Sequence, residues 1–125
     1  PALNFFSQSA LIAASRCLIP FDCDAFSRDA IYEVGVHIGD VRNDHNHDLR
    51  VEGIVVNQFM PRTRQHKEIV EALRAEGLPI LSSHLSPSVK IRESHQLAKP
   101  MIYLYPKHKL TGEYVALYRE IEAIT

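Results

Sequence analysis

The stretch VEGIVV, residues 51–56, is a short β-branched run that ends at Asn57 and is followed by the basic segment PRTRQHK, residues 61–67. Val and Ile without polar alternation are typical of a strand that is covered on both faces in a parallel sheet. Thr63 is a candidate cap for a helix that Gly77 would end. The stretch therefore predicts a buried strand, a polar strand end and a crossover helix.

The segments on either side repeat this pattern. Residues 16–21 form a second continuous apolar run, which favours another strand covered on both faces, and a third strand is expected at 78–83. Further helices are predicted where apolar residues recur three or four positions apart, at 3–14, 24–43 with Asp24 as cap, and 110–123. A short helix and loop are expected within 88–99, and residues 100–105 are expected to be extended before the break at Pro106.

Strands that alternate with helices predict an α/β fold, with right-handed crossovers and a parallel sheet that has helices on both faces. The chain shows no linker or repeat, so residues 1–125 are interpreted as one unit. Three strands are few for such a sheet and would leave an edge with little to cover it. The pattern therefore indicates that strands are missing.

Composition limits the classes of function. Of the 125 residues, 46% are apolar, and 14 Lys and Arg stand against 15 Asp and Glu, so the chain is no polycation. Any anion site must be local. The sequence has no membrane-spanning run and no signal-peptide pattern, and Cys17 and Cys23 match no zinc or disulfide spacing. These features favour a cytoplasmic protein with reduced thiols and no membrane attachment.

Ligands of open parallel sheets bind beyond the carboxyl ends of the strands. Three segments follow the predicted strands, at 21–24, 57–64 and 82–88, and they bring carboxylates, amides and cations. These segments are the places where a binding site is expected.

The second segment leads into a cluster of cations. Arg62, Arg64, His66 and Lys67 crowd the start of a predicted helix, where the helix dipole already gives a positive potential. Such a start is understandable if it faces a phosphate or a nucleic-acid backbone. The alternative is a solvated helix end with tolerated charges. Lys90 and its neighbours would extend the basic surface if that loop lay beside Arg62.

Other site patterns are missing from the sequence. The motif His45-x-His47 has no third ligand in register for zinc, and no Ser-His-Asp spacing is recognisable. The chain also lacks G-x-x-x-x-G-K-[ST], the loop that binds phosphates in many NTPases.

Six landmarks, taken in order, resemble the C-terminal half of a ParA/Soj-type partition ATPase, of the MinD/ParA class of deviant Walker-A proteins. They are PALN with SALIAA (1–4 and 9–14), CLIP (17–20), VEGIVV (51–56), RT (62–63), SVKIRES with KP (88–94 and 99–100), and LYPK with GEY (104–107 and 112–114). No single motif is decisive, but their order and spacing together are fairly specific.

The resemblance implies a P-loop NTPase (Rossmann-like) three-layer fold whose N-terminal half is absent from this chain. It implies a cytoplasmic, nucleoid-associated ATPase that forms a homodimer around ATP and Mg²⁺, binds DNA nonspecifically and works with a ParB-like centromere-binding protein. Asn57 matches the position that contacts adenine, Arg62 and Lys90 match DNA-binding positions, and Pro1 matches the segment next to the switch II aspartate.

The chain also departs from this family pattern. The Walker A lysine, switch I and the switch II aspartate are absent, so we expect no catalytic or metal-binding residue here and no ATP hydrolysis by this chain alone. The sequence of residues 86–88, SPS, replaces the family's usual I-P-R-N, and no basic amphipathic tail follows the last helix.

Three alternatives remain open. Pro1 could be the catalytic amine of a tautomerase-like enzyme, although that family's proline begins a strand and this one precedes a helical pattern. The chain could be a non-enzymatic α/β interaction module. It could also belong to another MinD/ParA-class ATPase, in cofactor synthesis or cell-division positioning.

Overall fold

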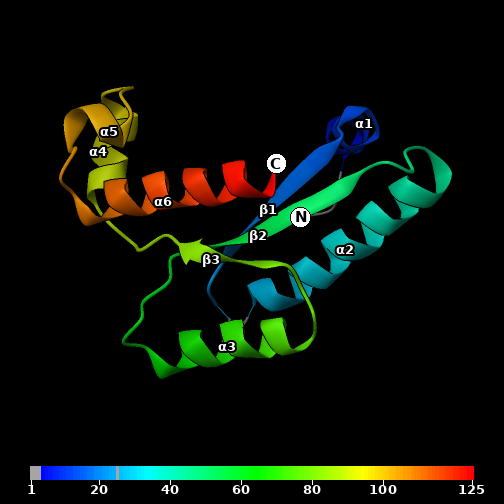
Figure 1. The fold of residues 1–125 in the computed structure, drawn as a ribbon, viewed down its shortest axis with the longest axis horizontal. Coiled ribbons are helices and arrows are strands. Elements are labelled where there is room, and N and C mark those ends of the chain that lie inside the picture. Colours follow the sequence, from blue (N-terminus) through cyan, green and yellow to red (C-terminus); the bar gives the residue numbers. More distant parts are fainter. Residues whose placement is uncertain (1–3, 25) are drawn as a thin grey trace.

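The core of the fold is a parallel sheet of three strands in the order β1-β2-β3 (Figure 1). The computed structural model describes residues 4–24 and 26–125, so Pro1 lies outside the described residues. The strands are β1 Arg16–Asp22, β2 Arg50–Asn57 and β3 Ile80–His84, and the helices are α1 Phe5–Ala13, α2 Ser27–Asp44, α3 Arg64–Ala75, α4 Lys90–Gln96, α5 Met101–Leu104 and α6 Lys109–Ile124. Both strand pairs are parallel, which confirms the predicted α/β class.

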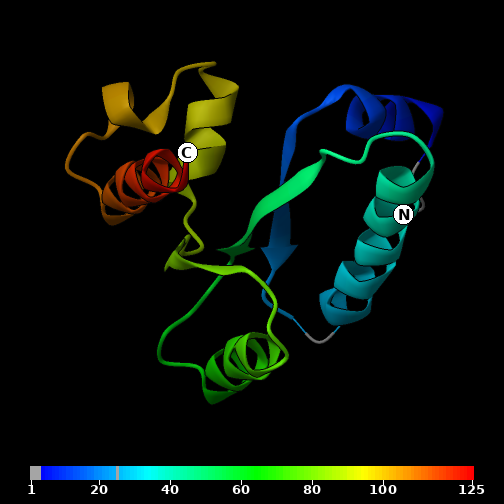
Figure 2. The same ribbon diagram turned by 45° about the vertical axis from the view of Figure 1, so that its right-hand side comes forward.

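Helices cover both faces of the sheet. Helices α2 and α3 lie on one face, and α6 lies on the other with α4 and α5 beyond it (Figures 1 and 2). Successive side chains of β2 alternate between the two layers, as strand geometry requires. Ile54 and Val56 pack with Ile31 of α2 and Leu73 of α3, whereas Val55 belongs to the core of the α6 layer.

The structure confirms two of the three predicted helix-end signals and contradicts the third, the Thr63 cap. Asp24 Oδ1 accepts a hydrogen bond of 2.7 Å from the Ser27 N–H at the start of α2. Gly77 follows α3 with φ of +84°, the left-handed conformation that glycine adopts without a steric penalty. Thr63 precedes α3, but its side chain makes no capping hydrogen bond.

Helix α1 packs against the C-terminal end of α2 and is fastened there by Asn46. The Asn46 Nδ2 group donates to the carbonyl oxygens of Leu11 and Ala14, at 3.1 and 2.7 Å, and so satisfies carbonyls at the end of α1. The outer side of this apolar helix is uncovered, because Phe5 and Phe6 are 77% and 79% exposed.

Two further expectations from the sequence are wrong. Residues 100–105 are not extended, because Met101–Leu104 is the short helix α5. Pro100 is the N-cap residue of this helix and has an extended backbone, so the extended conformation ends where α5 begins. Strand β1 is not covered on both faces either, since Leu18 is 42% exposed. A continuous apolar run therefore marks an outer strand here.

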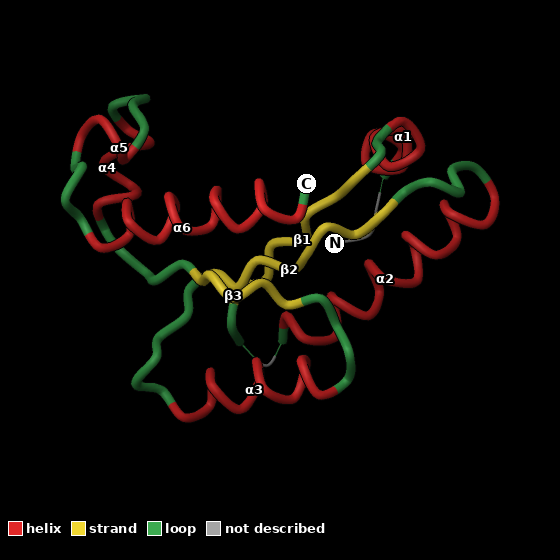
Figure 3. The backbone as a smooth tube through the Cα atoms, in the orientation of Figure 1, coloured by secondary structure: helices red, strands yellow, loops and turns green. Residues whose placement is uncertain are grey.

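The two edges of the sheet differ. Helix α6 closes the edge at β3, where the carboxylate of Glu120 accepts hydrogen bonds from the backbone N–H groups of Ser82 and Ser83, both at 2.7 Å. Two turns earlier on the same helix, Glu113 accepts from the Ser86 N–H at 3.0 Å. At the other edge no described strand pairs with the outer side of β1 (Figure 3). Within the described residues, the edge at β1 is therefore open to a further strand.

Replacing Glu120 by glutamine should lower the free energy of unfolding by about 1–2 kcal/mol at neutral pH. Each carboxylate oxygen of Glu120 accepts one backbone N–H, whereas glutamine has a single, uncharged acceptor oxygen. Burial alone would raise the pKa of Glu120, but the N–H groups of Ser83 and Ser82 hold it below its ordinary value of 4.5. Ionisation of Glu120 thus stabilises the fold above the unfolded-state pKa, and this stabilisation is lost as the pH falls through the lower folded-state pKa.

Denaturant unfolding of the wild type and Glu120→Gln at a series of pH values measures this effect. The stability difference should be largest near neutrality and should shrink below about pH 4.5. Glu122→Gln is the matched control, because among the described residues Glu122 accepts only from the exposed Tyr118 hydroxyl on the same helix. A difference that stays constant down to acid pH would contradict the proposed role of the Glu120 charge.

Candidate functional site

The carboxyl ends of β1 and β2 bring two polar side chains together. Asp22 and Asn57 are the last residues of these strands and are direct partners in the parallel register. The Asn57 Nδ2 group donates a hydrogen bond of 2.9 Å to Asp22 Oδ1. Asp22 is exposed and Asn57 is half-buried, so a ligand that lies against these strand ends can reach both side chains.

Backbone hydrogen bonds hold the loops around this pair in place. The Cys23 N–H, just after β1, donates to the Asn57 carbonyl at 3.0 Å, and the Phe59 N–H donates to the Leu85 carbonyl at 3.0 Å. Between them, Gln58 has φ of +54°, in the left-handed region that non-glycine residues seldom adopt. Such backbone conformations persist only where the surroundings fix them. Backbone hydrogen bonds therefore connect the loops that follow all three strands, at the carboxyl end of the sheet.

The Cys23 thiol lies at this edge but is not a candidate nucleophile. Its Sγ lies 3.7 Å from the His66 carbonyl oxygen, toward which it donates. Burial, with a smaller contribution from the charge of Asp24, raises the pKa of Cys23 to about 11. The thiolate, which is the reactive form, is therefore scarce at neutral pH.

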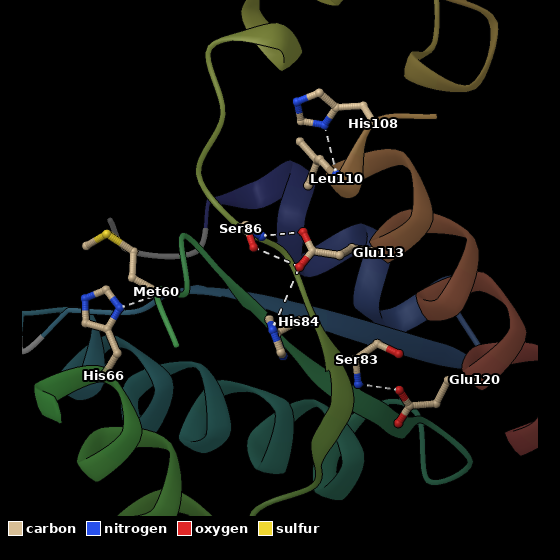
Figure 4. Close-up of polar contacts among 9 residues, drawn as sticks. All are labelled: Met60, His66, Ser83, His84, Ser86, His108, Leu110, Glu113 and Glu120. Atoms are coloured by element: carbon tan, nitrogen blue, oxygen red, sulfur yellow. Dashed lines mark hydrogen bonds and ion pairs between the residues drawn. The ribbon is translucent and has the colours of Figure 1, made fainter. Parts of the chain in front are cut away.

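The predicted basic cluster at the start of α3 is only partly free. Arg62 and Lys67 are exposed and have no ion-pair partner among the described residues, whereas Arg64 pairs with Glu68 at 2.7 Å. His66 turns back to the preceding loop, where its Nδ1 accepts from the Met60 N–H at 3.0 Å (Figure 4). Within the cluster, Arg62 and Lys67 are therefore available to bind an anion. His66 instead stabilises the loop before α3 through its hydrogen bond with Met60.

Lys90, the other predicted DNA-binding residue, is engaged within the chain. Its Nζ lies 3.4 Å from both carboxylate oxygens of Glu93 and 4.9 Å from the centre of the Tyr105 ring. The Tyr105 hydroxyl donates to Glu93 and, together with Lys90, holds the pKa of Glu93 below its ordinary value. An incoming phosphate would have to compete with Glu93 for Lys90.

The two halves of the predicted basic surface are separated. Helices α3 and α4 lie on opposite sides of the sheet, near the carboxyl ends of its strands (Figures 1 and 2). Lys90 therefore does not lie beside Arg62 within one copy of the chain, and the two residues do not form one continuous basic surface. Arg62 and Lys90 instead lie on opposite sides of the strand ends.

Sequence reasoning missed a polar cluster that joins the end of β3 to α6. Glu113 accepts from the Ser86 hydroxyl at 2.8 Å and lies 3.8 Å from His84 Nε2 (Figure 4). The His84 ring packs on Phe59, with ring centres 4.5 Å apart. The only signal was the spacing of Glu113 and Glu120, seven positions apart, which places both on one face of the last helix.

No helix in residues 4–24 and 26–125 is long and apolar enough to span a membrane. Within the same ranges, no group of three or more His, Cys, Asp or Glu side chains is arranged to hold a metal ion.

The chain is similar in sequence to partitioning proteins. It is 30% identical to the chromosome partitioning protein ParA of Myxococcus xanthus over 97% of its own length and 43% of the relative's. It is 23% identical to the sporulation initiation inhibitor protein Soj of Bacillus subtilis over 98% of its length and 49% of the relative's. These matches confirm the resemblance to ParA/Soj proteins, and the chain spans about half the length of these relatives. No family model matches the chain.

A solved structure shares the fold. Cobyrinic acid a,c-diamide synthase from Mycobacterium smegmatis aligns with a TM-score of 0.57 and 20% identity, covering 80% of this chain and 43% of the synthase. The same synthase has been solved with an ATP analogue and magnesium. The likeness confirms the predicted parallel α/β fold of the P-loop NTPase type.

Proposed function

We infer that this chain is the C-terminal part of a ParA/Soj-type partition ATPase of the MinD/ParA class. The observation that carries the inference is the match to ParA of Myxococcus xanthus along 97% of the chain. The parallel sheet and its polar strand ends agree with it. In the whole protein, this part supplies the base side of a nucleotide site and part of a DNA-binding surface.

The nucleotide is ATP with Mg²⁺, as the synthase of the same fold binds an ATP analogue with magnesium. Asn57 contacts the adenine base, because it stands at the end of the middle strand with its amide accessible. The phosphates and the metal are held by the part of the protein that carries the phosphate-binding loop. What the residues of this chain do is to orient the base.

DNA is bound through its backbone without sequence preference, and Arg62 contributes to this contact within the chain, beside the exposed Lys67. The charge of Arg62 has no ion-pair partner among the described residues, whereas Lys90 is held by Glu93. The protein works as an ATP-bound homodimer on the nucleoid in the cytoplasm, with a ParB-like centromere-binding protein. A dimer would also present two copies of the separated basic groups to one duplex.

The first test is nucleotide binding by the complete gene product that contains this chain. Asn57→Ala should weaken ATP binding about 10-fold, the effect of losing one paired amide, while the protein stays folded. Gln58→Ala is not a suitable control because of its positive φ, so Asn43→Ala, exposed at the far end of α2, serves instead. Titration of a fluorescent ATP analogue measures both variants. Equal affinity of wild type and Asn57→Ala would refute the base contact.

A second candidate function is another MinD/ParA-class ATPase, such as an enzyme of cofactor synthesis, because the structural neighbour is a cobyrinic acid synthase. DNA binding separates the two candidates. A partition ATPase should bind any duplex in the presence of ATP, and binding should weaken strongly between about 50 and 200 mM salt. ATP binding without DNA binding at low salt would favour the synthase-type function.

A further inference from the structure

The Asp22 side chain determines how the Asn57 amide can face a ligand. A carboxylate is an acceptor only, so the group that lies 2.9 Å from Asp22 Oδ1 must be the Nδ2 amino group of Asn57. The amide oxygen of Asn57 then points away from Asp22. The orientation of the amide follows from the chemistry of its neighbour.

The opposite orientation is unfavourable. Turning the amide by 180° would place its oxygen against the charged oxygen of Asp22, so a charge-assisted hydrogen bond would be replaced by repulsion between two acceptors. The backbone supports the same arrangement, because the Cys23 N–H donates to the Asn57 carbonyl at 3.0 Å and keeps the two strand ends together. Asn57 therefore offers a fixed acceptor, together with its second N–H donor.

This fixed pattern matches one purine better than the other. Adenine carries an amino donor at C6 next to ring-nitrogen acceptors, and an amide pairs with it through one oxygen and one N–H. Guanine carries an oxygen at C6, which would meet the amide oxygen of Asn57. If the amide were free to turn, it could place its N–H opposite the guanine oxygen as well. The difference in affinity between adenine and guanine nucleotides would then be smaller.

We propose that Asp22 is a positioning residue that makes the nucleotide site select adenine over guanine, by fixing the Asn57 amide with its oxygen toward the base. The proposal rests on the proposed function, because it requires a purine nucleotide against Asn57. The second carboxylate oxygen of Asp22 accepts no hydrogen bond from the described residues, so the contact with Asn57 is the one polar contact of this side chain among them.

The experiment compares ATP and GTP binding by the complete gene product, with fluorescent analogues of both nucleotides. Asp22→Ala should lower ATP affinity about five- to tenfold and change GTP affinity less than about twofold, so the ATP/GTP preference falls. Asp22→Asn keeps the size of the side chain, and its amide oxygen can still accept from Asn57. The new amide can also turn by 180°, however, so the ATP/GTP preference of Asp22→Asn should lie between those of the wild type and Asp22→Ala.

Asp24→Asn is the matched control. It removes the same charge two residues away, from a carboxylate that accepts from the Ser27 N–H and does not touch Asn57. Its ATP/GTP preference should equal that of the wild type. Because Asp22 is exposed, its variants should fold, and thermal unfolding of each variant checks this.

The outcomes separate the two levels of the proposal. Equal losses of ATP and GTP affinity in Asp22→Ala, or no loss, would overturn the role of Asp22 and leave the proposed ATPase intact. A wild-type protein that binds neither nucleotide would overturn both. A lower ATP/GTP preference in Asp22→Ala with an unchanged preference in Asp24→Asn would support the proposal.

Discussion

Replacing Gly53 by valine should lower the free energy of unfolding by about 3 kcal/mol, since it overfills a closed part of the core. Gly53 lies in the middle strand, and a Cβ atom there would stand 2.4 Å from Leu81 Cδ2 and 2.6 Å from Leu81 Cγ. Leu81 is only 5% exposed and packs in the core beneath α6, so it has little room to move. Equilibrium unfolding in denaturant measures the loss.

The reason for this loss can be tested separately. In the Leu81→Ala background the valine gains space, so the two changes together should cost less than the sum of their separate effects, by about 1–2 kcal/mol. Gly35→Ala is the control, because no atom lies within 4 Å of its added Cβ, and it should leave the protein unchanged or stabilise α2. Additive effects of Gly53→Val and Leu81→Ala would contradict the steric explanation.

Arg62→Glu should weaken DNA binding by the ATP-bound protein by more than about 10-fold, because it replaces a phosphate contact with a repulsive charge. The salt dependence should also become less steep, by about one unit of the log–log slope. Arg62 is exposed and free of ion pairs among the described residues, so the change should not disturb the fold. A gel shift on duplexes of unrelated sequence, repeated at several salt concentrations, measures both effects.

Two controls make this result specific. Arg42→Glu changes the net charge equally but lies in the last turn of α2, at the amino-terminal end of the sheet, and should reduce binding much less. Lys90→Ala should have a smaller effect than Arg62→Glu, because Glu93 already compensates the charge of Lys90. If Arg42→Glu weakens DNA binding as much as Arg62→Glu, the effect is one of net charge and the proposed surface is wrong.

The sequence predicted those parts of the fold that depend on local patterns. The strands around residues 51–56 and 16–21 and the four longer helices lie where apolar spacing and caps placed them, within one to three residues. Residues 100–105 were misjudged because a short apolar run does not distinguish a strand from a helix, and the start that Pro100 sets for α5 was overlooked. The exposure of β1 was missed because burial depends on what packs outside the strand.

The candidate site was predictable in position but not in detail. Strand-end logic placed Asn57 and the start of α3 at the carboxyl edge of the sheet, since parallel strands end together. The bond between Asn57 and Asp22 depends on the register of two strands that lie 35 positions apart in the chain. The internal pairing of Lys90 with Glu93 and the inward turn of His66 depend on side-chain conformations, which sequence patterns do not determine.

The most direct test of the central claim is DNA binding by the complete gene product with and without ATP, at salt concentrations from about 50 to 200 mM. The proposed partition ATPase should bind duplexes of any sequence only when ATP is present, and its affinity should fall linearly with salt on a log–log scale. Binding that is the same with and without ATP, or no binding at the lowest salt, would contradict the claim.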